Sequence, residues 1–180
     1  MKIQWLALVV GLQSLWVIST VITQESRLRR GEVVRMETVP VDPRDLLRGD
    51  YVILNYKISR LKPELFQGRP PVEAAAGTPV YVRLERHGDF HEAAAASLDP
   101  LPPEPGRPVL KGTVSIRPDR VRDAQDALRV EYGLERYYVK EGTGNPSGKV
   151  TVDVSVAASG HGVIKQVYVD GIPYSQAVPR

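Results

Sequence analysis

The sequence contains no cysteine in its 180 residues. This absence excludes disulfides, thiolate metal sites and cysteine nucleophiles. It leaves the redox compartment open, because a chain without cysteine folds in either environment. The length is sufficient for one domain with a substantial core. The hydrophobic share of 42% and the charged share of 25% are ordinary for a globular protein.

The body of the chain lacks any excess of charge. The formal net charge of +3 arises in the first 30 residues, from Lys2, Arg27, Arg29 and Arg30 against Glu25. The remaining residues carry 20 basic and 20 acidic side chains. Binding to nucleic acid needs clustered Lys and Arg that face phosphates. The neutral body therefore argues against a nucleic-acid partner.

Charge is missing altogether from residues 3–23, IQWLALVVGLQSLWVISTVIT. A helix of that length rises about 31 Å, which is roughly the thickness of a hydrocarbon core. A cleaved signal peptide, the first alternative, needs small residues at its cleavage site, whereas Trp16 and Ile18 crowd that region. A buried helix of a soluble protein is the second alternative. We predict a single-pass membrane anchor over residues 1–30, with the lipid bilayer as its partner.

The orientation of this anchor has two interpretations. Arg27, Arg29 and Arg30 follow the span, and the positive-inside rule then places the body in the cytoplasm. A short basic start, one span and a soluble domain are together typical of an exported, anchored protein. We expect the soluble domain on the periplasmic or extracytoplasmic side.

From residue 31 to residue 180 the hydrophobic period is two, which predicts an all-β domain. The clearest case is residues 150–156, where four valines alternate with Thr151, Asp153 and Ser155. We expect about eight short strands in a sandwich or small barrel. The expected strands are residues 32–39, 51–58, 80–84, 110–117, 128–132, 136–140, 150–156 and 163–169.

Other segments read as turns, loops or a short helix. Residues 160–162, Gly-His-Gly, predict a hairpin between the last two strands. Five prolines make residues 99–108 an extended surface loop. Residues 60–67 suggest a short helix with Pro63 in its first turn. The four alanines of residues 93–96 are expected in a loop or a single helical turn.

Two possible ligand sites are incomplete. His87, Asp89 and His91 have the spacing of metal ligands on one strand face, but a polar turn at residues 88–89 is the simpler interpretation. Residues 141–149 resemble a phosphate-binding loop but lack the glycine and the Ser or Thr at the required positions. We expect a Gly-rich hairpin loop there. The sequence indicates no catalytic residue, no metal site and no cofactor.

Charges of both signs alternate in residues 42–50, directly before a predicted strand. In a structural interpretation the aspartates cap turns and pair with the arginines, and Gly49 supplies an unusual backbone angle. In a binding interpretation the arginines hold a carboxylate or phosphate. Tyr51 and Tyr56 are five residues apart, so a regular strand places them on opposite faces. The candidate binding residues are Asp42, Arg44, Asp45, Arg48, Gly49, Asp50, Tyr51, Tyr56, Arg136, Tyr137 and Glu141.

Residues 49–56, Gly-Asp-Tyr-Val-Ile-Leu-Asn-Tyr, match the pattern G-D-Y-x-x-L-x-Y. The chain resembles the bacterial GDYXXLXY domain family, which takes its name from this signature. The resemblance implies a membrane-associated bacterial protein that is found with multi-span membrane partners, and it implies no known activity or substrate. Lys140 departs from the family, where a proline often precedes the Glu-Gly pair. Further similar segments are residues 40–45, 132–139, 141–142 and 170–171.

These observations lead us to expect a membrane-anchored β domain of the cell envelope. It would serve as a non-catalytic accessory or binding module for a membrane-protein partner or a cell-envelope component. One alternative is a hydrolase or lyase that uses Asp42, Asp45 or Asp50 as acid or base. The other alternative is a binding module for a small anionic ligand.

Overall fold

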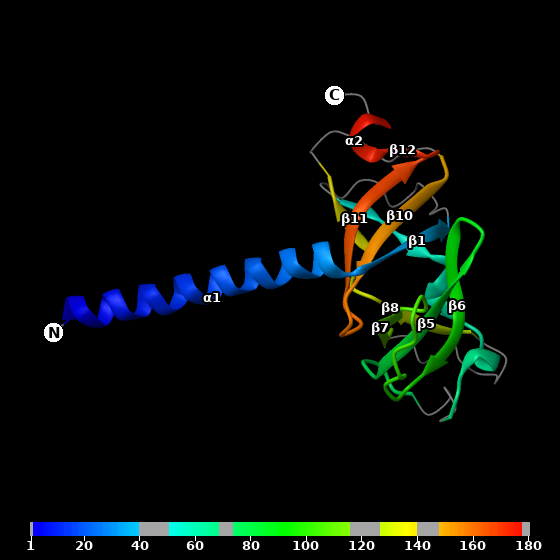
Figure 1. Cartoon of the computed structure of the whole chain (residues 1–180), viewed down its shortest axis with the longest axis horizontal. Coiled ribbons are helices and arrows are strands. Elements are labelled where there is room, and N and C mark those ends of the chain that lie inside the picture. Colours follow the sequence, from blue (N-terminus) through cyan, green and yellow to red (C-terminus); the bar gives the residue numbers. More distant parts are fainter. Residues whose placement is uncertain (1, 40–50, 69–73, 116–126, 140–147, 178–180) are drawn as a thin grey trace.

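A computed structural model describes residues 2–39, 51–68, 74–115, 127–139 and 148–177. A long helix projects from a β-rich body (Figure 1). The helix α1 (Lys2–Arg30) is separated from the strand β1 (Glu32–Val39) by Gly31 alone. The all-β class of the body is confirmed.

The helix α1 is long and apolar enough to cross a membrane between Gln4 and Thr23, where its mean hydropathy is 1.9. None of this segment is buried against the body, so the structure does not use it as a core helix. Its threonine hydroxyls bond within the helix, because Thr20 Oγ1 donates to the carbonyl of Trp16 at 2.9 Å. Polar groups satisfied in this way are compatible with apolar surroundings.

The first sheet has five antiparallel strands in the order β12-β11-β10-β1-β3. The strands β10 and β11 form the predicted hairpin, and its turn is closed by the Gly160 N–H, which donates to the Ala157 carbonyl at 2.8 Å. The strands other than β1 are β3 (Asn55–Tyr56), β10 (Val150–Val156), β11 (Gly162–Val169) and β12 (Ile172–Pro173).

The second sheet also has five strands, in the order β4-β8-β7-β5-β6. The hairpin β5–β6 turns at residues 88–89, where Gly88 has a φ of 62°; the predicted polar turn is confirmed. The strands are β4 (Arg60–Leu61), β5 (Pro79–His87), β6 (Phe90–Ser97), β7 (Val109–Val114) and β8 (Leu128–Glu131).

A two-stranded ribbon of β2 (Tyr51–Ile53) and β9 (Arg136–Tyr138) completes the β structure. The chain from residue 51 to residue 61 links all three sheets. It pairs with β9 in the ribbon as β2 and joins the edge of the first sheet as β3. It then forms the short 3-10 helix η2 (Lys57–Ser59) and joins the edge of the second sheet as β4. The signature segment therefore holds the parts of the body together.

Both sheets and the linking segment bury their apolar side chains in a single core. The valines of β10 that were expected on one face contribute Val152, Val154 and Val156 to it. The short helix α2 (Tyr174–Ala177) follows β12 and packs its buried Tyr174 against the same core. Further core residues are Val34, Met36, Leu54, Tyr56, Ile58, Leu61, Val80, Val82, Leu84, Leu110, Leu128 and Val130.

The described residues form twelve strands rather than about eight, and the additional strands are β3, β4, β6 and β12. Residues 51–58 were expected as one strand, but the ladder breaks at Leu54, whose N–H donates to the Glu135 carbonyl at 2.8 Å. The alanines 93–96, expected in a loop or helical turn, lie in β6. Alanine carries little strand propensity and no alternating pattern, so pairing with β5 decides their conformation.

The predicted short helix at residues 60–67 is only partly present. Pro63 does begin a single turn, the 3-10 helix η3 (Pro63–Leu65). Arg60 and Leu61 pair with β8 instead and belong to β4. The proline-rich segment connects β6 and β7 without a strand of its own, as expected. Buried Arg83 binds this segment through the Pro102 carbonyl at 2.8 Å and Glu104 at 3.0 Å.

Candidate functional site

We call residues 51–56 the signature strand, and its side chains alternate between the surface and the core. Leu54 and Tyr56 lie on the buried side. Tyr51 and Ile53 lie on the outward side, since successive residues of a strand face opposite ways. The Tyr56 hydroxyl donates to the Leu134 carbonyl at 2.8 Å. Tyr51 and Tyr56 thus occupy opposite faces as their spacing predicts, and Tyr56 has a structural position inside the body.

The first part of the signature strand, β2, pairs with β9, so outward-facing side chains of the two strands lie side by side. Tyr51 is the register partner of Tyr138, and Ile53 is the partner of Arg136. The rings of Tyr51 and Tyr138 pack edge to face with centroids 6.2 Å apart. The Arg136 guanidinium lies 5.7 Å from the Tyr51 ring centroid. Tyr138 is 71% exposed, so this aromatic pair with its cation is open to solvent.

Arg129 extends the same surface from the second sheet. Its Nη2 donates to Asn55 Oδ1 over a long 3.5 Å bond. Within the described part of the chain, neither Arg129 nor Arg136 has a carboxylate at salt-bridge distance. We call this surface the signature face. It consists of Tyr51, Ile53, Asn55, Arg129, Arg136 and Tyr138.

Tyr137 points away from the signature face. It is half-buried against the core and packs edge to face on Tyr174, with centroids 5.6 Å apart. Of the two candidates in β9, Arg136 lies beside Tyr51 and Tyr137 does not. The remaining candidates lie outside the described residues: Asp42, Arg44, Asp45, Arg48, Gly49, Asp50 and Glu141.

A second polar assembly lies on β1. The Arg35 guanidinium makes two hydrogen bonds to Asp153, at 2.7 and 2.9 Å, and lies 5.0 Å from the Tyr168 ring centroid. The hydrogen bonds that Arg35 donates to Asp153 raise the pKa of Arg35 above its ordinary value. The Arg35 backbone N–H donates to His91 Nδ1 at 3.2 Å, which attaches the β5–β6 hairpin to β1.

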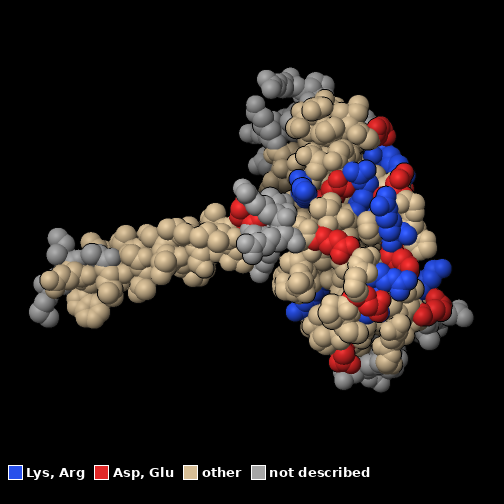
Figure 2. Space-filling view, in the orientation of Figure 1, with Lys and Arg blue, Asp and Glu red and all other residues tan. Residues whose placement is uncertain are grey.

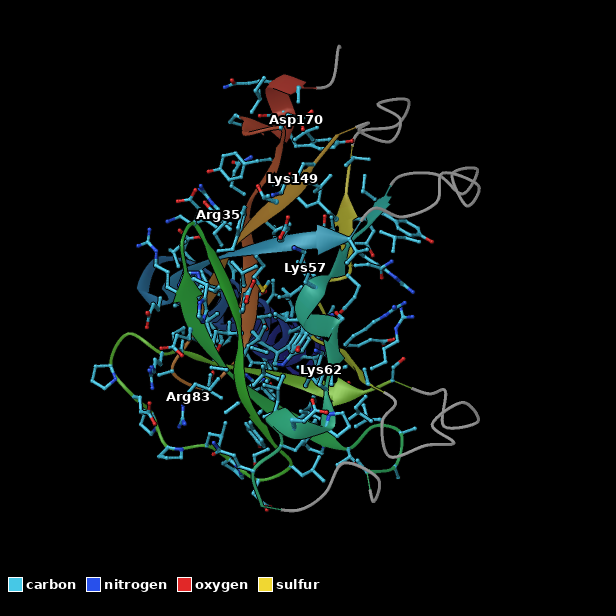
Figure 3. The ribbon with its side chains drawn as sticks, turned by 90° about the vertical axis from the view of Figure 1, so that its right-hand side faces the viewer. Arg35, Lys57, Lys62, Arg83, Lys149 and Asp170 are labelled. Atoms are coloured by element: carbon cyan, nitrogen blue, oxygen red, sulfur yellow. The ribbon has the colours of Figure 1, made fainter. Side chains whose placement is uncertain are left out.

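The same side of β1 carries Glu37 between two lysines, Lys57 and Lys149. These two partners lower the pKa of Glu37. The Lys149 ammonium also lies 4.7 Å from the Phe90 ring centroid, and its backbone N–H donates to Asp170 Oδ1 at 2.8 Å. In Figure 3, Arg35 and Lys149 lie close to the green hairpin, and Lys57 lies below the blue β1.

We call these residues the β1 ion-pair network: Arg35, Glu37, Lys57, Lys149 and Asp153. Each carboxylate has at least one cationic partner. Glu37 stays ionised well below neutral pH, so it is unsuited to donate a proton near pH 7. Figure 2 shows the wider pattern on this side of the body, where basic and acidic side chains alternate and no single sign dominates. The ion pairs of the network join β1 to η2 and to the β10 segment, which is a structural role.

The GDYXXLXY family model, described as GDYXXLXY protein, matches residues 13–167. The chain belongs to the GDYXXLXY family. The search of curated proteins and the search of solved structures found no match. In this GDYXXLXY protein the match runs from the middle of α1 into β11, so it includes the whole signature face and the whole β1 ion-pair network.

The sequence predicted part of the signature face of this GDYXXLXY protein and none of the β1 ion-pair network. Tyr51 and Arg136 were among the candidate residues, but Tyr138 and Arg129 were missed. The β1 ion-pair network was missed entirely. The only sequence signal for it is the alternation that places Arg35 and Glu37 on the polar side of β1. Their partners follow only from the strand register.

Proposed function

We propose that this GDYXXLXY protein is a membrane-anchored, non-catalytic binding module for a protein partner in or at the same membrane. The observation that carries the proposal is the direct passage of the apolar helix α1 into β1 through Gly31. Residues 24–30 add about 10 Å of helix beyond the apolar segment. The body is therefore carried close to the bilayer.

This closeness favours membrane partners. A module tethered to a surface meets other components of that surface at a high effective concentration, so even a weak contact becomes occupied. The end of α1 also contacts β10 and β11, which restricts how far the body can swing away. A membrane protein is the favoured partner class, and a cell-envelope component is the second.

Binding is favoured over catalysis by what the surface offers. The signature face presents Tyr138 and Arg136 to solvent, and Tyr and Arg are the residue types that dominate binding hot spots. Glu37 on β1 and Asp153 on β10 are both engaged by cations. We place the body on the periplasmic or extracytoplasmic side of the membrane, in line with the order of basic start, span and soluble domain.

The test uses the tagged full-length chain, cross-linked in intact cells and purified from a detergent extract. A chain limited to residues 1–30 is the matched control. We expect the full-length chain to retain a membrane protein in a fixed ratio, and the control to lose it. Recovery of the same proteins by both chains would refute a binding role for the body.

The side of the membrane is tested separately with a C-terminal fusion to a phosphatase that is active only outside the cytoplasm. An active fusion supports the proposed topology. An inactive fusion, together with activity of a cytoplasmic reporter at the same position, places the body inside the cell and contradicts it.

A further inference from the structure

We infer that the signature face binds an acidic, extended segment of a protein partner. In this arrangement Arg129 and Arg136 hold carboxylates of the segment, and Tyr51, Ile53 and Tyr138 pack against its other side chains. The inference rests on the proposed function, because it assigns the surface and the chemistry of the partner.

The first argument is that the arginines of the signature face differ from other arginines of the body in their carboxylate partners among the described residues. Elsewhere on the body, Arg35, Arg83 and Arg107 each contact a carboxylate within 3.0 Å. Within the described residues, Arg129 and Arg136 contact none. A guanidinium presents donors in a planar fork that matches a carboxylate. The surface is therefore complementary to an acidic ligand.

The second argument is a like-charged pair beside this surface. Arg129 is the register partner of Arg60 across the antiparallel strands β4 and β8, and both are exposed. Like charges directly opposite each other destabilise a sheet. The described part of the chain places no carboxylate there to relieve the repulsion. An acidic ligand relieves it on binding, so its affinity includes this gain.

The third argument is the apolar content of the surface, which favours a peptide over a small anion. Tyr138 is 71% exposed and Ile53 is 39% exposed, and both lie beside the arginines. The Tyr51 ring holds the Arg136 guanidinium at 5.7 Å, which orders that side chain before a ligand arrives. A small anion would pair with the arginines but would leave the exposed rings and Ile53 without a partner.

The fourth argument is the spacing along the strand. Tyr51, Ile53 and Asn55 share the outward side at a period of two, so they extend over about 13 Å. A segment in extended conformation presents its own side chains at the same period. A segment whose acidic and apolar residues follow one another at every second position shows both kinds on the same side. Such a segment would place carboxylates over Arg136 and Arg129 and apolar groups over Ile53 and Tyr138.

The test measures peptide binding to the full chain in nanodiscs of phosphatidylcholine, by fluorescence anisotropy. The probe is a labelled peptide that repeats Glu-Ser-Val-Ser, so that Glu and Val share one side of the extended chain, and the control peptide carries Gln in place of Glu. We expect the Glu peptide to bind about tenfold more tightly than the Gln peptide. About 0.5 M NaCl should weaken the Glu peptide strongly, because exposed charges are screened.

The variants are matched in charge. Arg129→Gln with Arg136→Gln should weaken binding at least about tenfold. Arg86→Gln with Lys165→Gln removes the same charge from exposed positions on other strands and should leave binding within about twofold. Tyr138→Ala should weaken binding severalfold while the thermal unfolding curve stays unchanged, because Tyr138 is mostly exposed.

Three results would overturn the inference. Equal binding of the Glu and Gln peptides removes the acidic character of the ligand. Full competition by inorganic phosphate, with no effect of Tyr138→Ala, makes the surface a small-anion site. Binding that appears only in a chain with Asp42→Asn, Asp45→Asn and Asp50→Asn shows that the chain's own carboxylates occupy the arginines.

The cross-linking experiment separates this inference from the proposed function. If the double variant of Arg129 and Arg136 still captures the membrane protein, the module binds its partner through another surface. The proposed function then stands and the inference fails. If wild type captures nothing beyond the span-only control, the proposed function itself fails.

Discussion

At the residue scale, two buried tyrosine hydroxyls connect the signature segment to the chain before β9. Tyr56 donates to the Leu134 carbonyl at 2.8 Å, and Tyr132 donates to the Ile58 carbonyl at 2.7 Å. Burial raises the pKa of both phenols above the ordinary value of 10.0, so both hydroxyls stay protonated and able to donate. The two bonds run in opposite directions between the same two segments, and together they fix the position of β2 beside β9.

Replacing Tyr56 by Phe should lower the free energy of unfolding by about 1–2 kcal/mol. The ring still fills its site, but the Leu134 carbonyl loses its donor inside the body. Urea denaturation monitored by circular dichroism measures the change. Tyr51→Phe is the control, because Tyr51 lies on the outward side and should change stability by less than about 0.5 kcal/mol. Equal losses in both variants would contradict the role of the Tyr56 hydroxyl.

His91 predicts a pH dependence with a defined sign. The Nδ1 atom of His91 accepts a hydrogen bond from the Arg35 N–H. Burial lowers the pKa of His91 below 6.5, and the charge of Arg86 adds a smaller effect in the same direction. The charges of Glu32 and Asp153 raise this pKa, but they do not outweigh burial. The unfolded state therefore binds more protons than the folded state just below pH 6.5. This contribution to stability is present above pH 6.5 and is lost as the pH falls through the folded pKa.

The prediction is tested by the free energy of unfolding measured between about pH 7.5 and pH 5. Wild type should lose stability as the pH falls, and His91→Gln should lose less over the same range. His161→Gln is the control, because that exposed side chain lies in the β10–β11 turn. A slope that depends on His161 and not on His91 would refute the assignment.

At the element scale, the ion pair between Arg35 and Asp153 joins β1 to β10, two strands that lie far apart in the chain. Asp153 is 9% exposed, and it accepts both hydrogen bonds from Arg35. A carboxylate this buried is costly without its partner. By contrast, Arg107 and Glu85 form an ion pair at 2.5 Å that is largely exposed to solvent.

A double-mutant cycle of Arg35→Gln and Asp153→Asn should give a coupling free energy of about 1–2 kcal/mol. The same cycle on Arg107 and Glu85 should give a much smaller coupling, because exposed pairs gain little in water. Both are measured by urea denaturation at low and high salt. A larger coupling for the exposed pair would contradict the structural role of the buried one.

The contact between β7 and β8 leaves no room for a side chain at Gly112. A Cβ there would lie 2.5 Å from Val130 Cγ1 and 2.8 Å from the Glu131 carbonyl oxygen. Gly112→Ala should therefore destabilise the body by about 1–3 kcal/mol through overpacking. Thr113→Ala, at the next and exposed position, serves as the control. Thermal unfolding that leaves both variants like wild type would contradict the tight packing.

At the scale of the whole molecule, the helix and the body differ in whether their apolar side chains are buried within the chain. The body buries its apolar side chains in its own core, whereas the helix exposes large ones such as Trp5 and Trp16. Figure 1 shows most of the helix standing away from the body, and the body does not bury its apolar segment Gln4–Thr23. A lipid bilayer would cover these side chains, as the proposed membrane anchor implies.

The full chain should therefore stay in the membrane pellet after extraction with alkaline carbonate. A chain that begins at Gly31 should be released, because its surface charges are mixed and balanced. Immunoblots of pellet and supernatant measure the distribution, and circular dichroism checks that the released chain retains β structure. Release of the full chain would refute the anchor.

How far the sequence predicted the structure depends on how local each signal is. The bounds of β10 were predicted correctly, because four valines alternate without interruption. The alanines of β6 gave no such pattern, and only their pairing with β5 makes them a strand. Tyr51 and Tyr56 were assigned to opposite faces from their spacing alone. That Tyr137 faces Tyr174 while Arg136 faces Tyr51 depends on the register of β9.

The sequence by itself determined the apolar helix, the β class and the inner and outer sides of the strands. These follow from composition and period within a few neighbouring residues. Only the tertiary structure decided which polar residues meet. Arg35 binds Asp153, which lies 118 positions later in the chain. Arg136 lies beside the signature strand because its own strand, β9, pairs with β2. Such pairs are set by the register of strands around a common core, which depends on the packing of the whole body.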